Sequence, residues 1–139
     1  MEKCINCGRE LTQRQTKYCC YKCQQSYEQK QWVERWKNGD ESGLRGSYQV
    51  SSHIRTYLFE KYGSKCAQCG WGEVNPFTGN IPLEIEHIDG IYSNNTESNL
   101  TLLCPNCHSL TATYKGANRG KGREGRKKYY PSYANPEQE

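Results

Sequence analysis

The sequence is poor in apolar residues. Hydrophobic residues make up 34% of the 139 residues, and the mean hydropathy is -1.04. No apolar run is long enough to cross a membrane, and no segment has the pattern of a secretion signal. We therefore expect a cytoplasmic protein without a membrane partner, too polar for one apolar core of ordinary size. Such a chain needs another source of stability, usually bound metal or disulfide bonds.

Cysteine, in contrast, is abundant, and its spacing decides between metal and disulfides. The chain has nine cysteines, and an odd number in a reducing cytoplasm argues against a disulfide framework. Two CxxC pairs each have partner cysteines downstream, a pattern typical of structural zinc sites. We therefore expect two structural Zn²⁺ ions. The expected ligands are Cys66, Cys69, Cys104 and Cys107 for one ion, and Cys4, Cys7, Cys19 and Cys23 for the other.

The N-terminal cysteine set contains one member too many. Cys19, Cys20 and Cys23 lie in one short segment, so either Cys19 or Cys20 is spare. Cys19 and Cys23 would lie one helical turn apart on the same face, which favours that pair. Cys20 then remains as an extra thiol and as the alternative ligand.

The pattern of helices and charges predicts four segments. They are an N-terminal zinc-finger module at 1–27, a helical linker region at 28–63, a second metal domain at 64–115 and a basic tail at 116–139. Apolar spacing predicts a helix over 22–37, and Ser51 or Ser52 is expected to cap a second helix over 53–62.

The second metal domain combines a strand, a polar loop and a short helix. Residues 81–88 alternate as a half-buried strand does, and Asp89-Gly90 is a typical strand-ending turn. Residues 99–103 are mainly apolar and lead into the second half of the cysteine set. A short helix is expected from there to about Tyr114.

Three chemically capable features follow one another in this domain. They are Glu86-His87, then Asn99, then Cys104-x-x-Cys107-His108, with Cys66-x-x-Cys69 in front. This order resembles the HNH nuclease family, especially its zinc-bearing, phage-type members, and the match runs from Cys66 to about Thr111. The resemblance implies a small zinc-stabilised α+β fold. Its core would be a ββα-metal HNH nuclease domain, accompanied by an N-terminal Cys4 zinc-finger module and connecting helices.

The same resemblance implies a metal-dependent endonuclease that hydrolyses phosphodiester bonds of double-stranded DNA. His87 corresponds to the general base, a role that suits histidine because its ordinary pKa is about 6.5. Glu86 and His108 correspond to ligands of one catalytic divalent ion, expected to be Mg²⁺ with Mn²⁺ or another divalent ion as the alternative. Asn99 corresponds to the residue that pins the loop after the base.

Some of these roles have alternatives in the sequence itself. On a regular strand Glu86 and His87 would point to opposite faces, so we expect the strand to distort at His87. Asn99 is also a good helix N-cap. Asp89 is either a third metal-site oxygen or simply a turn residue.

A basic, glycine-rich segment follows the metal domain. Its basic residues are Lys115, Arg119, Lys121, Arg123, Arg126, Lys127 and Lys128. Such a segment suits a polyanion, which predicts DNA contacts, although a solvated chain end has the same composition. The alternative function is a non-catalytic, zinc-stabilised nucleic-acid-binding module. A phage-encoded enzyme would act in the bacterial host cell, where homing, DNA-packaging and restriction roles all suit these residues. Protein partners cannot be read from the sequence.

Overall fold

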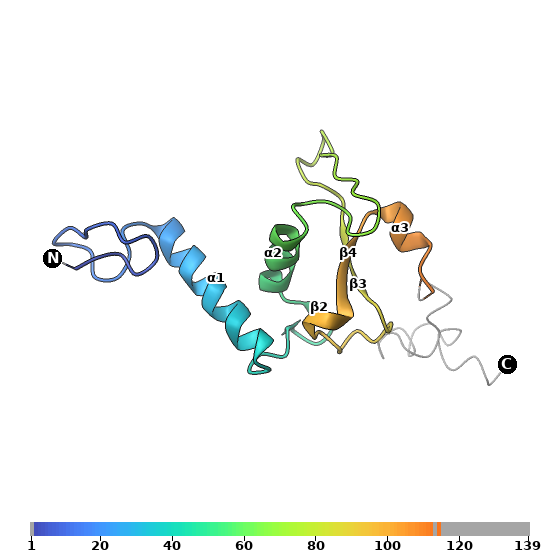
Figure 1. Ribbon diagram of the computed structural model, residues 1–139, viewed down its shortest axis with the longest axis horizontal. Coiled ribbons are helices and arrows are strands. Elements are labelled where there is room, and N and C mark those ends of the chain that lie inside the picture. The colour runs from blue at the N-terminus through green and yellow to red at the C-terminus, as the bar shows by residue number, and fades with distance from the viewer. Residues whose placement is uncertain (1, 113, 115–139) are drawn as a thin grey trace. The chain divides into compact units, whose positions relative to one another are not determined.

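A computed structural model describes residues 2–112 and residue 114 of the chain, which forms two compact units, Met1–Glu41 and Ser42–Glu139 (Figure 1). The elements in chain order are α1 (Tyr21–Lys37), β1 (Leu44–Arg45), β2 (Gln49–Val50), α2 (Ser52–Lys61), β3 (Glu84–His87), the 3₁₀ helix η1 (Glu97–Asn99), β4 (Leu100–Leu103) and α3 (Pro105–Ser109). Among the described residues, no helix has the length and apolar character required to cross a membrane.

The first unit consists of a cysteine knuckle and helix α1. Gly8 adopts a φ of 79°, which glycine tolerates without steric cost, and its N–H donates to the carbonyl of Cys4 at 2.9 Å. Helix α1 begins at Tyr21, one residue before the expected start, and ends at the expected Lys37. Its buried residues are Val33 and Trp36.

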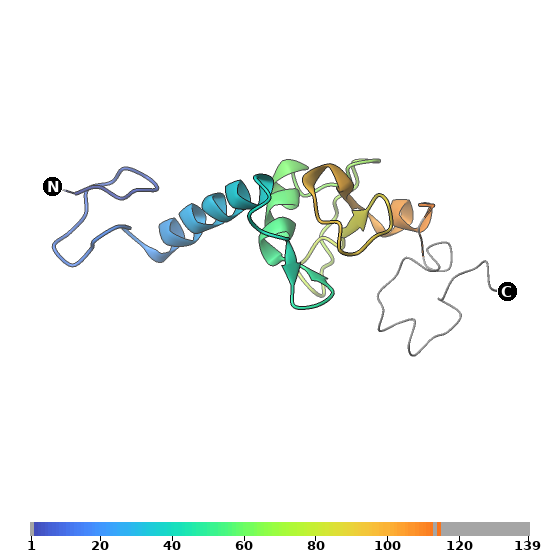
Figure 2. The same ribbon diagram turned by 90° about the horizontal axis from the view of Figure 1, so that it is seen from below.

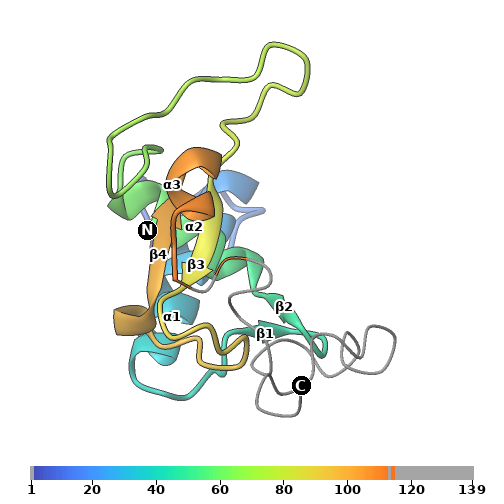
Figure 3. The same ribbon diagram turned by 90° about the vertical axis from the view of Figure 1, so that its right-hand side faces the viewer.

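The centre of the second unit is a pair of antiparallel strands between two helices. β3 pairs with β4 from Glu84↔Leu103 through His87↔Leu100. Helix α2 packs against β4, whereas α3 contacts both strands. The views agree that α2 and α3 lie on opposite sides of the strand pair (Figures 1, 2 and 3). The pair with α3 is therefore a ββα arrangement.

The core of the second unit contains few side chains, and a large share of them are cysteines. Its buried members are Leu83, Leu102, Leu103, Cys66, Cys104 and Cys107, with Phe59, Tyr62, Trp71, Ile81 and Ile85 packed around them. Ile54 and Leu58 of α2 are also completely buried. This small core agrees with the expectation that apolar burial alone does not hold the chain together.

Several predicted boundaries differ from the structure for local reasons. The strand expected over 81–88 is shortened to β3, because the N–H of Leu83 turns back to the carbonyl of Ile81 at 2.8 Å and Pro82 has no N–H to donate. Helix α3 ends at Ser109 rather than near Tyr114. Helix α2 begins and ends one residue earlier in the chain than the expected helix over 53–62.

The cap of α2 resolves one of the alternatives. The side chain of Ser51, not that of Ser52, accepts a hydrogen bond from the N–H of His53 at 3.2 Å. Ser51 is therefore the N-cap, and Ser52 is the first residue of the helix. A serine side chain at this position satisfies a backbone donor that the helix itself cannot reach.

Leu102 should be a sensitive position for stability, because its side chain has no exposed surface. We expect Leu102→Ala to lower the free energy of unfolding by about 2–5 kcal/mol through lost burial and the cavity left behind. Leu110, which is 74% exposed, is the matched control, and Leu110→Ala should change it by less than about 0.5 kcal/mol. Urea unfolding of the zinc-loaded protein measures both. Equal effects of the two substitutions would contradict the assignment of the core.

Candidate active site and zinc centres

The second cysteine set has the geometry of a metal centre. The sulfur atoms of Cys66, Cys69, Cys104 and Cys107 all lie within 4.8 Å of one another, and those of Cys69 and Cys104 are 3.7 Å apart. A tetrahedral site with zinc–sulfur bonds of about 2.3 Å places its sulfurs about 3.8 Å apart. These four residues could therefore hold Zn²⁺.

The backbone arranges this set from two segments. Gly70 donates to the carbonyl of Cys66 at 2.9 Å, which closes a knuckle like that of Cys4 and Gly8. The N–H of Ala67 donates to the carbonyl of Leu102 at 2.8 Å and joins this knuckle to β4. The sulfur of Cys104 accepts from the N–H of Cys107 at 3.4 Å and caps α3. One metal ion would thus tie the knuckle to the junction of β4 and α3.

The electrostatics of these thiols also suit a cation. Burial raises the pKa of the Cys66 thiol, but backbone N–H groups, that of Cys104 foremost, outweigh it and hold the pKa at about 6. Burial and the neighbouring thiols raise the pKa of Cys107 to about 12. Sulfurs this close cannot all ionise unless a cation offsets their mutual repulsion, which Zn²⁺ does in a Cys4 site.

The N-terminal set resembles the second one and bears on the choice between Cys19 and Cys20. The four sulfurs that lie within 4.8 Å of one another are those of Cys4, Cys7, Cys19 and Cys23. The sulfur of Cys19 is 3.5 Å from that of Cys7 and 3.6 Å from that of Cys23. Cys20 approaches Cys19 at 3.9 Å but lies outside the set. This set too could hold Zn²⁺.

Helix α3 brings His108 against two carboxylates of β3. Nδ1 of His108 lies 2.6 Å from Oε2 of Glu86, and its Nε2 lies 3.1 Å from Oε2 of Glu84. Glu86 is buried, whereas the side chain of Glu84 is half exposed. Strand alternation puts both glutamates on the side of the strand pair where α3 lies. Sequence reasoning named Glu86 and His108 and missed Glu84, although its position two residues before Glu86 could have indicated it.

The Glu86–His108 contact is suited to a shared divalent ion. Nδ1 of His108 is buried and makes no hydrogen bond among the described residues, although the Glu86 oxygen is 2.6 Å away. A ring nitrogen and a buried carboxylate oxygen that face each other this closely could serve as two ligands of one cation. The exposed Glu84 carboxylate would accept the Nε2–H, which leaves the lone pair on Nδ1. Two protein ligands leave room for the waters that Mg²⁺ usually retains.

The side chains of His87 and of its neighbour Glu86 contact different residues. Nε2 of His87 lies 2.7 Å from Oδ1 of Asn95, a residue that the sequence analysis did not single out. The expected distortion of the strand at His87 is not found, because pairing is regular through His87↔Leu100. The strand ends directly after His87, where the N–H of Gly90 turns back to the His87 carbonyl at 2.9 Å.

Asn99 closes the loop between His87 and β4 from both ends. Its Oδ1 accepts from the N–H of Asp89 at 3.0 Å, and its Nδ2 donates to the carbonyl of Asn94 at 2.8 Å. Asn99 lies at the end of η1 rather than at a helix N-cap. The motif residue His87 and the motif residue Asn99 are therefore joined through one loop.

Asp89 is engaged within this same loop. Its two carboxylate oxygens accept from Asn94 at 2.7 Å, from Asn99 at 2.9 Å and from the N–H of Ile91 at 2.8 Å. These donors lower the pKa of the Asp89 carboxyl, Asn94 first among them. In this arrangement the carboxylate organises the turn after β3.

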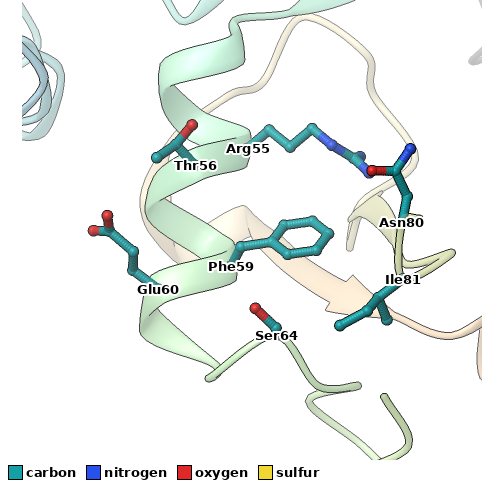
Figure 4. Close-up of a pocket in the computed structure, with 7 residues that line it drawn as sticks. All are labelled: Arg55, Thr56, Phe59, Glu60, Ser64, Asn80 and Ile81. Atoms are coloured by element: carbon teal, nitrogen blue, oxygen red, sulfur yellow. The ribbon is translucent and has the colours of Figure 1, made fainter. Parts of the chain in front are cut away.

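Among the hollows of this unit, two lie beside the strand pair and its helices. One of about 410 Å³ is lined by Glu86, Thr101 and residues just after α3, so it opens beside the candidate metal ligand. The other, about 430 Å³, is lined by Arg55, Phe59 and Asn80 on the α2 side (Figure 4). There the Arg55 guanidinium stacks 4.8 Å over the Phe59 ring and donates to the Leu83 carbonyl at 3.4 Å. Arg55 is thus packed against the protein, and the hollow beside Glu86 is the better candidate for substrate.

The predicted DNA-contacting residues Lys115, Arg119, Lys121, Arg123, Arg126, Lys127 and Lys128 lie outside the described residues.

The β3–β4–α3 unit is anchored at the second cysteine set and carries Glu86, His87 and His108. These features are those of a zinc-stabilised ββα-metal domain. Comparison with known protein families finds a similarity over this domain. Residues 66–111 match the model of the HNH endonuclease family.

One curated relative extends the similarity beyond this domain. The H-N-H endonuclease F-TflIV of Escherichia phage T5 is 38% identical over an aligned stretch of 97 residues. This stretch covers 66% of the present chain and 40% of that protein, so the chain spans well under half of its relative's length. No solved structure matches the chain.

The two cysteine sets predict two zinc ions per purified chain, measured by mass spectrometry of the metal content. Cys23→Ser should remove about one zinc, because a Cys4 site loses much of its affinity when a thiolate is replaced by a hydroxyl. Cys20→Ser is the matched control in the same segment and should retain both ions. The ligand assignment is wrong if Cys20→Ser loses zinc and Cys19→Ser does not.

Proposed function

We propose that this chain is a metal-dependent endonuclease that hydrolyses phosphodiester bonds of double-stranded DNA. The observation that carries the proposal is the contact between Glu86 and His108, with His87 directly after Glu86 in the sequence. All three residues lie in the region that matches the HNH endonuclease family. A carboxylate–histidine pair can hold a divalent ion. His87 alternates to the other face of β3 but is its last residue, so we propose that it serves as general base for a water bound beyond the end of the strand.

The proposed chemistry divides the work among these residues. His87 takes a proton from the attacking water, since a neutral imidazole accepts protons at physiological pH. Glu86 and His108 hold the divalent ion, which we propose to be Mg²⁺ with Mn²⁺ as the alternative. When bound, the ion polarises the phosphate and stabilises the leaving 3′ oxygen. Asn99 keeps the loop after His87 closed and so fixes the position of the base.

DNA binding is proposed to involve the basic segment after the nuclease domain. Its residues, from Lys115 to Lys128, would contact backbone phosphates, and such contacts make affinity fall steeply with salt concentration. We also propose a phage-encoded enzyme, with a homing or DNA-packaging role in the cytoplasm of a bacterial host. The phage origin of the relative supports this part of the proposal.

The competing function is a zinc-stabilised module that binds nucleic acid without cleaving it. Such a module would need the two cysteine sets and the basic segment. It would not need a buried glutamate paired with a histidine beside a second histidine. The presence of Glu86, His87 and His108 together therefore favours the enzyme.

Cleavage of supercoiled plasmid separates the two functions. We expect the zinc-loaded protein to nick or linearise plasmid in Mg²⁺ or Mn²⁺ but not in EDTA-treated buffer. His87→Ala should slow cleavage by about 10²- to 10⁴-fold, the usual contribution of a positioned general base. His53, on α2 and outside the candidate site, is the matched control, and His53→Ala should cleave at the wild-type rate.

Two outcomes would overturn parts of this proposal. Wild-type protein that binds plasmid but leaves it intact with every divalent ion tested would favour the binding module. A His87→Ala variant that cleaves as fast as wild type would remove His87 from the role of base.

A further inference from the structure

A side-chain contact with Asn95 holds the ring of His87, the proposed base. Nε2 of His87 lies 2.7 Å from Oδ1 of Asn95, and Asn95 is only 3% exposed. An amide oxygen carries no hydrogen and can only accept. With this oxygen facing the ring, the contact is a hydrogen bond when Nε2 of His87 carries the proton, and the lone pair of the neutral ring is then on Nδ1.

We propose that Asn95 is a positioning residue that holds His87 as the Nε2–H tautomer and leaves Nδ1 to take the proton from water. This inference rests on the proposed function of His87 as general base. It assigns to Asn95 the role that a base-orienting group has in other general-base sites, where loss of the correct tautomer costs activity although the base itself remains.

The loop around Asn95 is built to hold its side chain in place. Asn99 fixes the carbonyl of Asn94, the preceding residue, at 2.8 Å. The side chain of Asn94 is in turn held by Asp89 at 2.7 Å, and its Oδ1 accepts from Thr96 at 3.0 Å. The residues on both sides of Asn95 are thus anchored by side-chain hydrogen bonds, and Asn95 has little freedom to turn away from His87.

The same geometry links Asn99 to the base. Asn99 contacts the backbone at Asp89 and at Asn94, so it holds the loop at two points. Asn95 supplies the side-chain contact to the imidazole itself. In this arrangement Asn99 positions the loop, and Asn95 transmits that position to the ring of His87.

Nitrogen-15 NMR of the zinc-loaded protein, without added divalent ion or DNA, tests the inference directly. At a pH at which the imidazole is neutral, wild type should show the His87 proton on Nε2, slowed in its exchange with water by the hydrogen bond. Asn95→Asp keeps an acceptor oxygen and should retain this signal. Asn95→Leu has a similar shape but no acceptor and should lose it.

Plasmid cleavage provides the second measurement. Asn95→Leu should lower kcat by about 10- to 100-fold with little change in KM, because a displaced reacting group slows chemistry without weakening DNA contacts. Asn95→Asp should restore most of the rate. Asn80→Leu, at an exposed asparagine outside this loop, is the control and should cleave as wild type does.

The outcomes distinguish this inference from the proposed function. A protected Nε2–H in wild type that is lost in Asn95→Leu supports the positioning role even if no plasmid is cleaved, in which case only the proposed function fails. A wild-type His87 protonated on Nδ1, or a signal and kcat unchanged in Asn95→Leu, overturns the inference while leaving the nuclease intact. If Asn95→Leu does not fold, the wild-type tautomer and the cleavage rate of Asn95→Asp still test whether Asn95 positions His87.

Discussion

The convergence of four sulfurs at Cys66, Cys69, Cys104 and Cys107 is the constraint on which the second unit depends. Two of these cysteines flank the first turn of α3, and the other two belong to the knuckle whose backbone is joined to β4. A helix of five residues is too short to be stable alone. Metal binding at the sulfurs would fix both its position and its orientation against the strands.

The position of His108 follows from this constraint. It is the neighbour of Cys107, and successive helical residues lie about 100° apart around the helix axis. When the sulfur of Cys107 faces the cysteine set, the imidazole of His108 projects toward the glutamates of β3. The candidate zinc ligand Cys107 and the candidate catalytic ligand His108 are thus joined by a single peptide bond.

The sequence was most informative where ligand spacing decides the structure. The CxxC pairs and their downstream partners indicated the cysteine sets that the structure brings together, and the one-turn spacing between Cys19 and Cys23 favoured Cys19 over Cys20. The motif order pointed to Glu86 and His108, which meet at 2.6 Å. Glu84 and Asn95 were missed, for different reasons. Glu84 lies on the face of Glu86 by simple alternation, whereas the contact of Asn95 depends on loop closure by hydrogen bonds between distant residues. Neither composition nor periodicity encodes such closure in a loop rich in asparagine.

The proposed chemistry depends most on one divalent ion held by Glu86 and His108. Electron paramagnetic resonance of Mn²⁺ added to the zinc-loaded protein measures this without requiring cleavage. We expect one bound Mn²⁺ in wild type, with affinity weakened by about tenfold or more in Glu86→Gln and in His108→Ala, and zinc content unchanged in both. Glu60→Gln, at an exposed glutamate on α2, should bind Mn²⁺ as wild type does. Equal Mn²⁺ affinity in all four proteins would contradict the account.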